Sequence, residues 1–351
     1  MRAPAFALAA LVATLPLSNE GRTAGPPQPS ISFVTWRDPI EGAFTVRVPQ
    51  GWTVGGGMRR ASAIDPRSAV DVRSPDGVVH AFLGDYSIGT FEVPDAARLR
   101  MGMREGQTIP AGPNSPMAVT LMRYMPGAQF AHQYILRQCR DAHILNVQEL
   151  PDVGRGLAVG AEALNAQYHP RVSARAADVA FQCENREGKV EVGSVLATPP
   201  NGVGISMWTV PLLAAYTTTD PARAALGNAV MNMLIATFQY DRAWEARFNA
   251  QVAKVTGHVL GEQNALLRNV QARAGQQAAA SLNHPNDFTP SSGVVKPADT
   301  SGNKTVCSDT GTCASVSTAH TYYWMNNSQQ IVPGPETGEP PDNSGGWYPT
   351  H

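Results

Sequence analysis

A histidine, two carboxylates and a tyrosine lie within residues 76–86. His80 falls in an expected strand, Asp85 and Tyr86 follow the end of that strand, and Asp76 belongs to the turn before it. Imidazole titrates near neutrality and is the side chain used most often in acid–base chemistry. We therefore mark His80, Asp85 and Tyr86 as a candidate ligand-binding or titratable surface. The competing interpretation is structural, because a single histidine on a strand more often serves packing, and Asp76 suits a turn.

Familiar catalytic motifs are missing from the chain. It has no nucleophile elbow, no HExxH pair, no phosphate-binding loop and no dinucleotide fingerprint. Gly55-Gly56-Gly57 lacks the Lys-Ser/Thr of a phosphate loop, so it predicts a turn or a bulge. Serine, histidine and aspartate all occur, and a triad of them is recognised by geometry rather than by spacing. A hydrolase with a Ser/His/Asp or carboxylate site therefore stays an alternative, with its catalytic residues unknown.

Paired methionines suggest a second alternative, a copper-binding periplasmic protein. Met101 and Met103 form one M-x-M pair, and Met231 and Met233 form another. Thioethers suit Cu(I). Against this, Met233 is expected on the core face of a helix, and no histidine lies between His80 and His132. We expect no metal site and no cofactor.

Four cysteines allow three disulfide pairings. Cys307 and Cys313 flank a turn-forming Ser-Asp-Thr-Gly-Thr run, which predicts a pinned hairpin. That pairing leaves Cys139 with Cys183. A Cys-only zinc site is less favoured because neither pair has the tight spacing of a zinc knuckle, and a free catalytic cysteine is the least favoured interpretation.

The last 48 residues, 304–351, carry a group of aromatic side chains. Tyr323, Trp324 and Trp347 are candidates for stacking on sugar rings or on a partner. A module this small also needs its aromatic residues as core, or as a surface that docks on the main domain. Docking is the favoured interpretation.

Short β-branched and aromatic stretches separated by turn formers predict a sheet of short strands. Ser74-Pro75-Asp76-Gly77 and Asn185-Arg186-Glu187-Gly188 each predict the turn of a hairpin. Residues 126–139 predict a helix, and Asp220-Pro221 predicts the start of another. The expected fold class is α+β, an antiparallel sheet packed between helices, followed by a long helix and a small disulfide-pinned β-module. The main expected strands are 43–48, 52–54, 69–73, 78–83, 143–150, 174–183, 189–197 and 205–210.

Residues 242–282 predict a long helix. An uninterrupted helix of this length would extend about 60 Å. Gly257 and Gly261 weaken it, so a break between them is expected. Two interpretations remain open: the helix lies along its own domain, or it projects as an arm that docks a protein partner or a second copy of the chain. Its apolar face is expected to hold Trp244, Phe248, Val252, Val255 and Val259.

The N-terminal segment predicts export. A short positive start precedes an apolar run of 13 residues, Ala5 to Leu17, which is too short to span a bilayer and fits a signal peptide. The expected location is periplasmic or secreted, with no membrane span after signal removal. The expected divisions are a signal peptide (1–25), a Pro-rich lead-in (26–30), an α+β domain (31–241), the helical arm (242–282), a linker (283–303) and the C-terminal module (304–351).

The composition excludes a polyelectrolyte partner. Of the 351 residues only 16% are charged and the net charge is −1, so no field exists to steer nucleic acid. Gly at 32 and Pro at 28 indicate many turns and open linkers.

One stretch resembles a known family. The run from Phe44 to Trp52 has the form F-x-V-x-V-P-x-G-W, which is similar to a strand of the PsbP-like/Mog1-like group, and residues 221–237 with Phe238 are similar to its closing helix. The resemblance covers residues 31–245 and implies an antiparallel sheet between helices with an accessory, binding or scaffolding role, without family site residues to carry over. We therefore expect an exported, non-catalytic binding or scaffold protein of the bacterial envelope or exterior.

Overall fold

The computed structural model describes residues 31–111, 117–201, 204–257 and 260–283, and beyond them only the backbone of five short strands. The expected signal peptide and Pro-rich lead-in lie outside the described residues. The part from 31 to 283 is a mixed α+β fold, which confirms the expected class.

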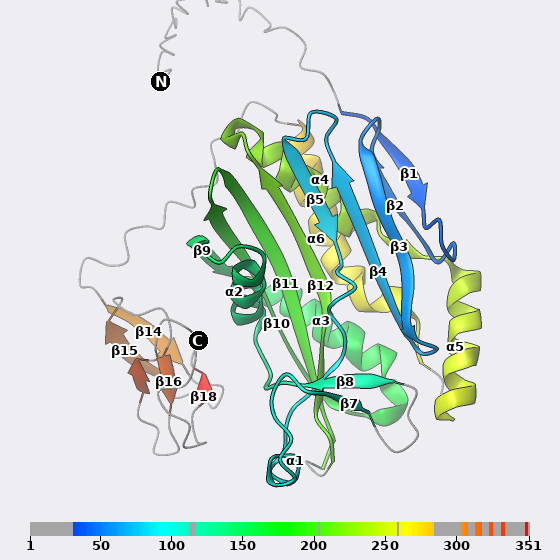
Figure 1. Cartoon of the computed structure of the whole chain (residues 1–351), viewed down its shortest axis with the longest axis vertical. Helices are drawn as coiled ribbons and strands as arrows, with labels where there is room; N and C mark the ends of the chain where they lie inside the picture. The colour runs from blue at the N-terminus through cyan, green and yellow to red at the C-terminus, as the bar shows by residue number, and fades with distance from the viewer. Residues whose placement is uncertain are drawn as a thin grey trace, which may run out of the picture. The chain divides into compact units, whose positions relative to one another are not determined.

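A large sheet forms the centre of this fold (Figure 1). Its strands follow the order β3-β4-β5-β12-β11-β10-β9, and every neighbouring pair in this order is antiparallel. Three short strands extend the sheet from β12, with β6 and β8 parallel to each other. The strands are β3 (Thr53–Ser62), β4 (Asp65–Arg73), β5 (Val79–Leu83), β6 (Phe91–Glu92), β7 (Thr108–Pro110), β8 (Ala118–Leu121), β9 (His143–Glu149), β10 (Arg171–Cys183), β11 (Arg186–Thr198) and β12 (Met207–Thr218).

Both predicted hairpins are present. The Ser74–Gly77 turn joins β4 to β5, and the Gly77 amide donates to the Ser74 carbonyl at 2.9 Å. The β10–β11 hairpin is present as well, but its turn is Glu184-Asn185. The predicted turn residues Arg186, Glu187 and Gly188 belong to β11, whose register places Arg186 opposite Cys183. These turns fix which side chains of neighbouring strands share a face, because strand residues alternate between the two faces.

The prediction of a turn at the three consecutive glycines is wrong. Strand β3 runs straight through them and pairs with β4. Gly56 has φ +112, and a Cβ there would lie 2.1 Å from the carbonyl oxygen of Ala69. Glycine therefore lets two backbones approach closely inside a sheet. A run of glycines in a sequence is compatible with such a close approach and with a turn, so the sequence alone does not separate the two.

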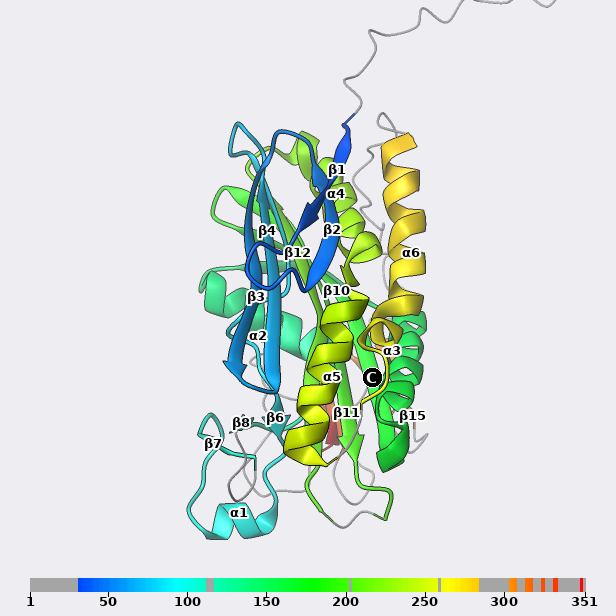
Figure 2. The same cartoon turned by 90° about the vertical axis from the view of Figure 1, so that its right-hand side faces the viewer.

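Helices cover both faces of the sheet, as Figures 1 and 2 show. Helix α2 (Gly127–Gln138) packs on β9, β10 and β11 from one side. Helices α3 (Pro151–Leu164) and α4 (Ala224–Thr237) pack on the opposite face, and α6 (Gln263–Asn283) lies against both of them. The other helical elements of this part are α5 (Arg242–Thr256), the short α1 (Ala96–Arg100) and the 3₁₀ turns η1 (Ala166–Tyr168) and η2 (Pro221–Arg223).

A second sheet of three strands lies beside α4. Its order is β1 (Phe33–Arg37), β2 (Phe44–Pro49) and β13 (Gln239–Tyr240). Strand β2 contains the Phe44 end of the family-like motif, and Phe44 packs on Phe238 with ring centroids 4.7 Å apart. This contact joins the start of the domain to the end of α4.

The segment predicted as one long helix forms two. Helix α5 (Arg242–Thr256) ends at Gly257, whose φ of +74 is the left-handed conformation common after a helix. Side chains of α5 and α6 are buried in the same core as those of β2 and α4, among them Trp244, Phe248 and Val270. The segment therefore lies along its own domain instead of projecting as an arm, because the domain itself uses its apolar face.

The chain beyond the linker is described only as backbone. The strands are β14 (Asn303–Cys307), β15 (Cys313–Ser317), β16 (Tyr323–Met325), β17 (Ile331–Pro333) and β18 (Tyr348–Pro349). The register of β14 and β15 places Cys307 opposite Cys313. The side chains of Tyr323 and Trp324, the whole of Trp347 and most of the predicted linker lie outside the described residues. Within the described ranges, no helix combines the length and the apolar character needed to cross a membrane.

Candidate functional site

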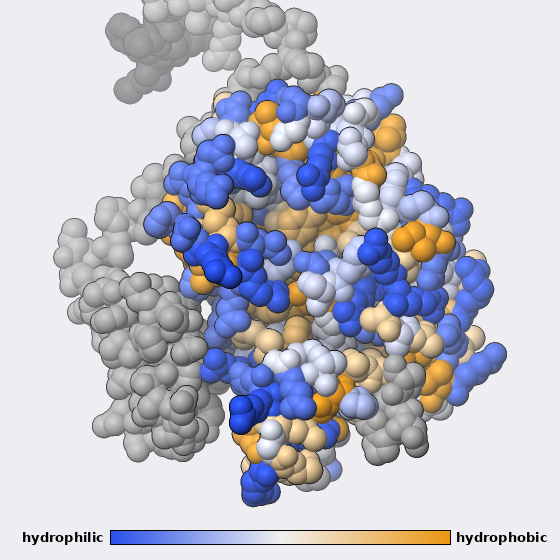
Figure 3. All heavy atoms as spheres, viewed as in Figure 1, coloured by the Kyte–Doolittle hydropathy of each residue, from blue (hydrophilic) through white to orange (hydrophobic). Residues whose placement is uncertain are grey.

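A hollow of about 520 Å³ opens on the α2 side of the central sheet, the face seen in Figure 3. We call it the α2 hollow. Its walls come from β3–β5 with the loop after β5 on one side, and from α2 and the adjoining ends of β10 and β11 on the other. The residues that line it are Gly56, Arg59, Ala69, Val70, Asp71, His80, Phe82, Gly84, Asp85, Tyr86, Tyr134, Ile135, Gln138, Phe181, Arg186, Val190, Ala215 and Thr217.

Small residues account for the hollow's depth. Helix α2 packs on β9, β10 and β11, so β4, β5 and β12 meet the hollow beside it. On and next to those strands the lining residues include Gly56, Ala69, Gly84 and Ala215. A sheet surface made of such residues lacks the side chains that would otherwise fill the space beside a helix.

His80 forms an acid–base pair in the wall of the hollow. Its Nε2 lies 2.5 Å from Oδ2 of Asp71, and the Nε of Arg73 donates to Oδ1 of the same carboxylate at 3.0 Å. Burial disfavours the ionised form of Asp71, but the hydrogen bonds from His80 and Arg73 outweigh burial and hold the pKa of Asp71 below its ordinary value. The imidazole is 30% exposed and the carboxylate 41%, so solvent reaches both.

Asp85 is held by two residues. The Tyr134 hydroxyl of α2 donates to Oδ2 at 2.9 Å, and the Ser87 amide donates to Oδ1 at 2.7 Å. Burial disfavours the Asp85 carboxylate, yet hydrogen bonds from the side chain and amide of Ser87 and from Tyr134 keep its pKa below the ordinary value. Burial and the neighbouring Asp85 charge together raise the pKa of Tyr134 strongly, so its hydroxyl stays a donor.

Tyr86 and Arg59 form the end of the hollow at β3. The Tyr86 hydroxyl donates to the Gly57 carbonyl at 2.9 Å. The guanidinium of Arg59 lies over the Tyr86 ring, 4.4 Å from its centroid. This stacking is a cation–π contact, and it fixes where the exposed guanidinium is presented.

The structure brings His80, Asp85 and Tyr86 to one hollow. Their partners, chiefly Asp71, Tyr134 and Arg59, were not predicted from the sequence. Asp71 could have been found, because the predicted hairpin pairs Arg73 with His80, and Asp71 then lies on the same face two residues away. Tyr134 and Arg59 come from elements whose position beside the hairpin follows only from the three-dimensional fold.

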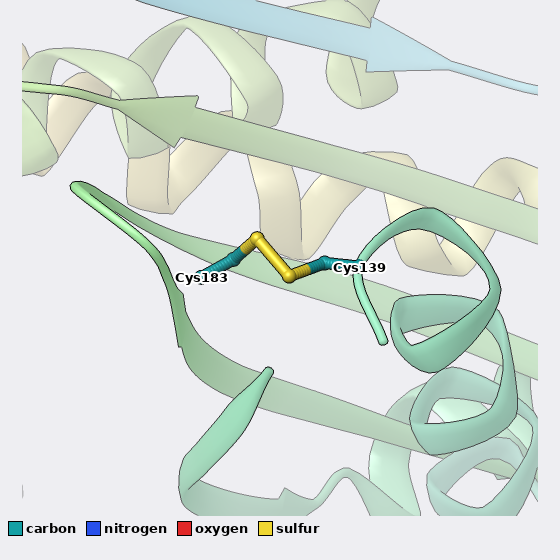
Figure 4. Close-up of a disulfide and its surroundings, with 2 residues drawn as sticks. All are labelled: Cys139 and Cys183. Atoms are coloured by element: carbon teal, nitrogen blue, oxygen red, sulfur yellow. A yellow bond between two sulfur atoms is a disulfide. The ribbon is translucent and has the colours of Figure 1, made fainter. Parts of the chain in front are cut away.

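The Cys139–Cys183 disulfide confirms one predicted pairing (Figure 4). Cys139 is the residue after the last turn of α2, and Cys183 is the last residue of β10. The bond therefore attaches the C-terminal end of α2 to the sheet. Gln138 and Arg186, next to this attachment, line the far end of the hollow.

The methionine pairs do not form a common site. Met231 is fully buried in the core with α4, whereas Met233 is only partly buried, the reverse of the expected roles. Met101 is 64% exposed, and Met103 packs on the small cluster around Ile109. Within the described ranges, no three His, Cys, Asp or Glu side chains come together in a way that could hold a metal ion.

A second hollow, of about 880 Å³, lies between the three-stranded sheet, α5 and α6, and its lining is more polar. Much of that polarity joins the elements together. The Asn264 side chain bonds both the amide and the carbonyl of Tyr240, and the Thr237 hydroxyl accepts from the Arg47 amide at 2.9 Å. These polar groups therefore serve the docking of α6 and β2.

A buried charged cluster lies on the opposite face of the sheet. Arg273 of α6 donates to Oε1 of Glu191 at 3.0 Å, and Lys189 donates to Asp178 at 3.0 Å. Asp178 and Glu191 face each other across β10 and β11, and each keeps one buried oxygen without a donor within the described residues. Burial, and then the Asp178 charge, raise the pKa of Glu191 to about 7.

The chain was compared with protein-family models, with curated proteins and with solved structures. No family model, no curated protein and no solved structure matches the chain.

Proposed function

We propose that this chain is an exported, non-catalytic binding protein of the bacterial envelope or exterior, and that it binds its ligand in the α2 hollow. The observation that carries the proposal is the hollow itself, a concave and largely apolar surface with a few polar groups at fixed positions. Binding sites for small ligands commonly have this character. The Cys139–Cys183 disulfide supports an oxidising compartment, and hence export.

The lining residues favour binding over covalent catalysis. Among the described residues that line the hollow, none is a serine or a cysteine, and the only aliphatic hydroxyl belongs to Thr217. Asp71 and Asp85 are each engaged by two residues. A PsbP-like arrangement, with its accessory and binding roles, remains part of the proposal and rests on the strand motif at Phe44–Trp52.

One observation favours a second candidate, a hydrolase that activates water. His80 beside Asp71 is the histidine–carboxylate arrangement that general-base catalysis uses, and the imidazole is partly exposed in a hollow. The two candidates differ in what His80→Ala does. A binding protein without catalysis gives the same turnover of an activated ester with and without this imidazole.

The test places a bulky side chain in the floor of the hollow. Ala69 lies partly exposed on β4, where a phenylalanine suits a strand and fills the space. We expect the native protein to bind the fluorescent dye 1-anilinonaphthalene-8-sulfonate and Ala69→Phe to lose that binding at unchanged thermal stability. Equal dye binding by both proteins would overturn the site. Hydrolysis of p-nitrophenyl butyrate that disappears in His80→Ala would establish the second candidate instead.

The C-terminal module adds a separate proposal. We propose that Cys307 and Cys313 are joined, supported by the register that sets them opposite each other on β14 and β15. Mass spectrometry of unreduced peptides tests this, and two free thiols at these positions would contradict it. Docking of a partner through residues 242–282 gains no support, because the buried side chains of α5 and α6 pack within the domain.

A further inference from the structure

The carboxylates of the α2 hollow already have donors. Oδ1 of Asp71 accepts from Arg73, and Oδ2 pairs with His80. The two oxygens of Asp85 accept from Ser87 and Tyr134. A carboxylate has about four acceptor sites, so a cation could still approach, but it would share each oxygen with a donor that is already there. The two acids therefore offer a cation a weaker site than unpaired carboxylates would.

Arg59 differs from these carboxylates in having no partner of opposite charge among the described residues. Its guanidinium is exposed above the Tyr86 ring at 4.4 Å. Stacking occupies the face of the guanidinium and one of its N–H groups bonds the Tyr86 hydroxyl, which leaves the other N–H groups for a ligand. An N–H edge held in place binds a carboxylate through two parallel hydrogen bonds. This end of the hollow therefore offers a prepared site for one anionic group.

The surface leading away from Arg59 is long and mostly apolar, although Asp71, His80 and Thr217 also line it. The lining runs from Gly56 on β3 through Phe82 on β5 and Ala215 on β12 to Phe181 on β10. These residues span five strand-to-strand steps, and at ~4.8 Å a step the surface is about 24 Å long. Tyr134 and Ile135 of α2 cover its far part. A compact ring would cover only a fraction of this length, whereas an extended hydrocarbon chain would bury its whole surface.

We propose that the α2 hollow binds a long-chain carboxylate, with the head group on Arg59 and the hydrocarbon chain laid across the sheet toward Phe181. The proposal rests on the proposed function and names its ligand class. The charge comes from the stacked guanidinium of Arg59, which has no carboxylate partner among the described residues, and the length comes from the mostly apolar floor. Binding removes both the floor and the chain from water, while the head group stays at the solvent edge.

Arg186 provides the matched control. It lines the same hollow and is also exposed, but it is the first residue of β11, at the other end, and no aromatic ring among the described residues stacks on it. Arg59 and Arg186 carry the same charge, so a general electrostatic attraction would weaken by the same amount on loss of either. A head group seated on Arg59 depends on Arg59 alone.

The experiment is calorimetric titration of the full chain with dodecanoate and with dodecylammonium, both below their micellar concentrations. The two probes share one chain length and differ in the sign of the head group. We expect dodecanoate to bind at least about tenfold more tightly, which corresponds to 1.4 kcal/mol. Arg59→Gln should weaken dodecanoate about tenfold, Arg186→Gln less than about twofold, and Ala69→Phe should abolish binding of both probes.

Each outcome decides a different part of the proposal. Equal binding of the two probes, both blocked by Ala69→Phe, would overturn the carboxylate and leave the hollow as the binding site. Equal losses for Arg59→Gln and Arg186→Gln would overturn the seat of the head group. Dodecanoate binding that survives Ala69→Phe would overturn the hollow, and with it the proposed function. Unfolding curves of each variant show whether a loss comes from the fold instead.

Discussion

Each face of the central sheet carries an acid paired with a base, but one pair is exposed to solvent and the other is buried. On the α2 side, Asp71 and His80 are 41% and 30% exposed. On the other side, Glu191 is 0% exposed beneath Arg273 of α6. Removing the partner of a solvent-exposed charge changes the unfolding free energy little, because water takes the place of the partner. A buried charge has no such replacement. The exposed pair can therefore serve binding, while the buried pair fixes a helix.

The faces also differ in how their helices are attached. A disulfide between Cys139 and Cys183 attaches α2 beside the hollow. Helix α6 has no such bond among the described residues and reaches the sheet through Arg273 and its apolar side chains. A covalent attachment holds through a change of pH, whereas an ion pair depends on the charge of its members. The α2 face is thus expected to keep its shape under conditions that loosen the opposite face.

The largest expected effect comes from Arg273→Met. This change keeps most of the side-chain volume and leaves the buried Glu191 carboxylate without its cation. Breaking a buried pair in this way costs about 3–5 kcal/mol of unfolding free energy. Urea unfolding at pH 8 measures the loss.

Arg268→Met is the matched control for Arg273→Met. It lies on the same helix, and its pair with Glu262 is 3.4 Å long and exposed. We expect a change below about 1 kcal/mol. Equal losses in the two variants would show that helix α6, and not the buried charge, is what the substitution disturbs.

The next effect concerns the attachment of α2. Replacing both Cys139 and Cys183 with serine opens a loop with a sequence separation of 44. The chain-entropy argument gives a loss of about 4 kcal/mol, and measured losses are commonly about 2–4. Unfolding in urea measures it, with the native protein under reducing agent as the control. A native protein whose stability does not change on reduction would contradict the assigned role of the bond.

Local patterns predicted much of the α2 face of the sheet and little of the opposite face. The Ser74–Gly77 turn, the helix at 126–139 and the Cys139–Cys183 pair all follow from residues close together in sequence or from elimination among four cysteines. Glu191 could not be recognised, because its partner Arg273 is 82 residues away and a charged residue on a strand is ordinarily exposed.

Helix α3 shows a second limit of sequence patterns. Its Pro-Asp-Val-Gly-Arg-Gly start contains glycines that weaken a helix in isolation. In the fold those glycines allow close contact, since a Cβ on Gly154 would lie 3.0 Å from the Ala174 carbonyl oxygen. Tertiary packing therefore outweighs the low helix propensity of these glycines, and their role becomes apparent only when the helix is seen packed on the sheet.

A smaller effect of the buried face is a dependence of stability on pH. Burial raises the pKa of Glu191 from 4.5 to about 7, with Asp178, Lys189 and Arg273 as its charged neighbours. Below pH 4.5 the folded and unfolded chains both hold this proton, and the stabilisation is complete. Between 4.5 and 7 the unfolded chain releases it first, so stability falls as pH rises, by roughly 3 kcal/mol from this group.

The variant Glu191→Gln isolates that contribution. Other groups, such as Asp71 and Asp85 with their lowered pKa values, act in the opposite direction at lower pH and are common to both proteins. We expect the difference in unfolding free energy between Glu191→Gln and the native chain to grow in favour of the variant from pH 5 to pH 8. A difference that stays constant over this range would show that Glu191 is ionised throughout.

The smallest effect is expected on the exposed face, from Asp71→Asn. The substitution keeps the shape of the side chain and removes a charge that is 41% exposed, so the unfolding free energy should change by less than about 1 kcal/mol. His80→Gln removes the other member of the pair and should change the unfolding free energy by a similarly small amount. Dodecanoate should bind slightly more tightly to Asp71→Asn, because the hollow loses a negative charge. A loss of stability as large as that of Arg273→Met would break the distinction between the faces, since it would mean that the pair in the hollow also holds the fold together.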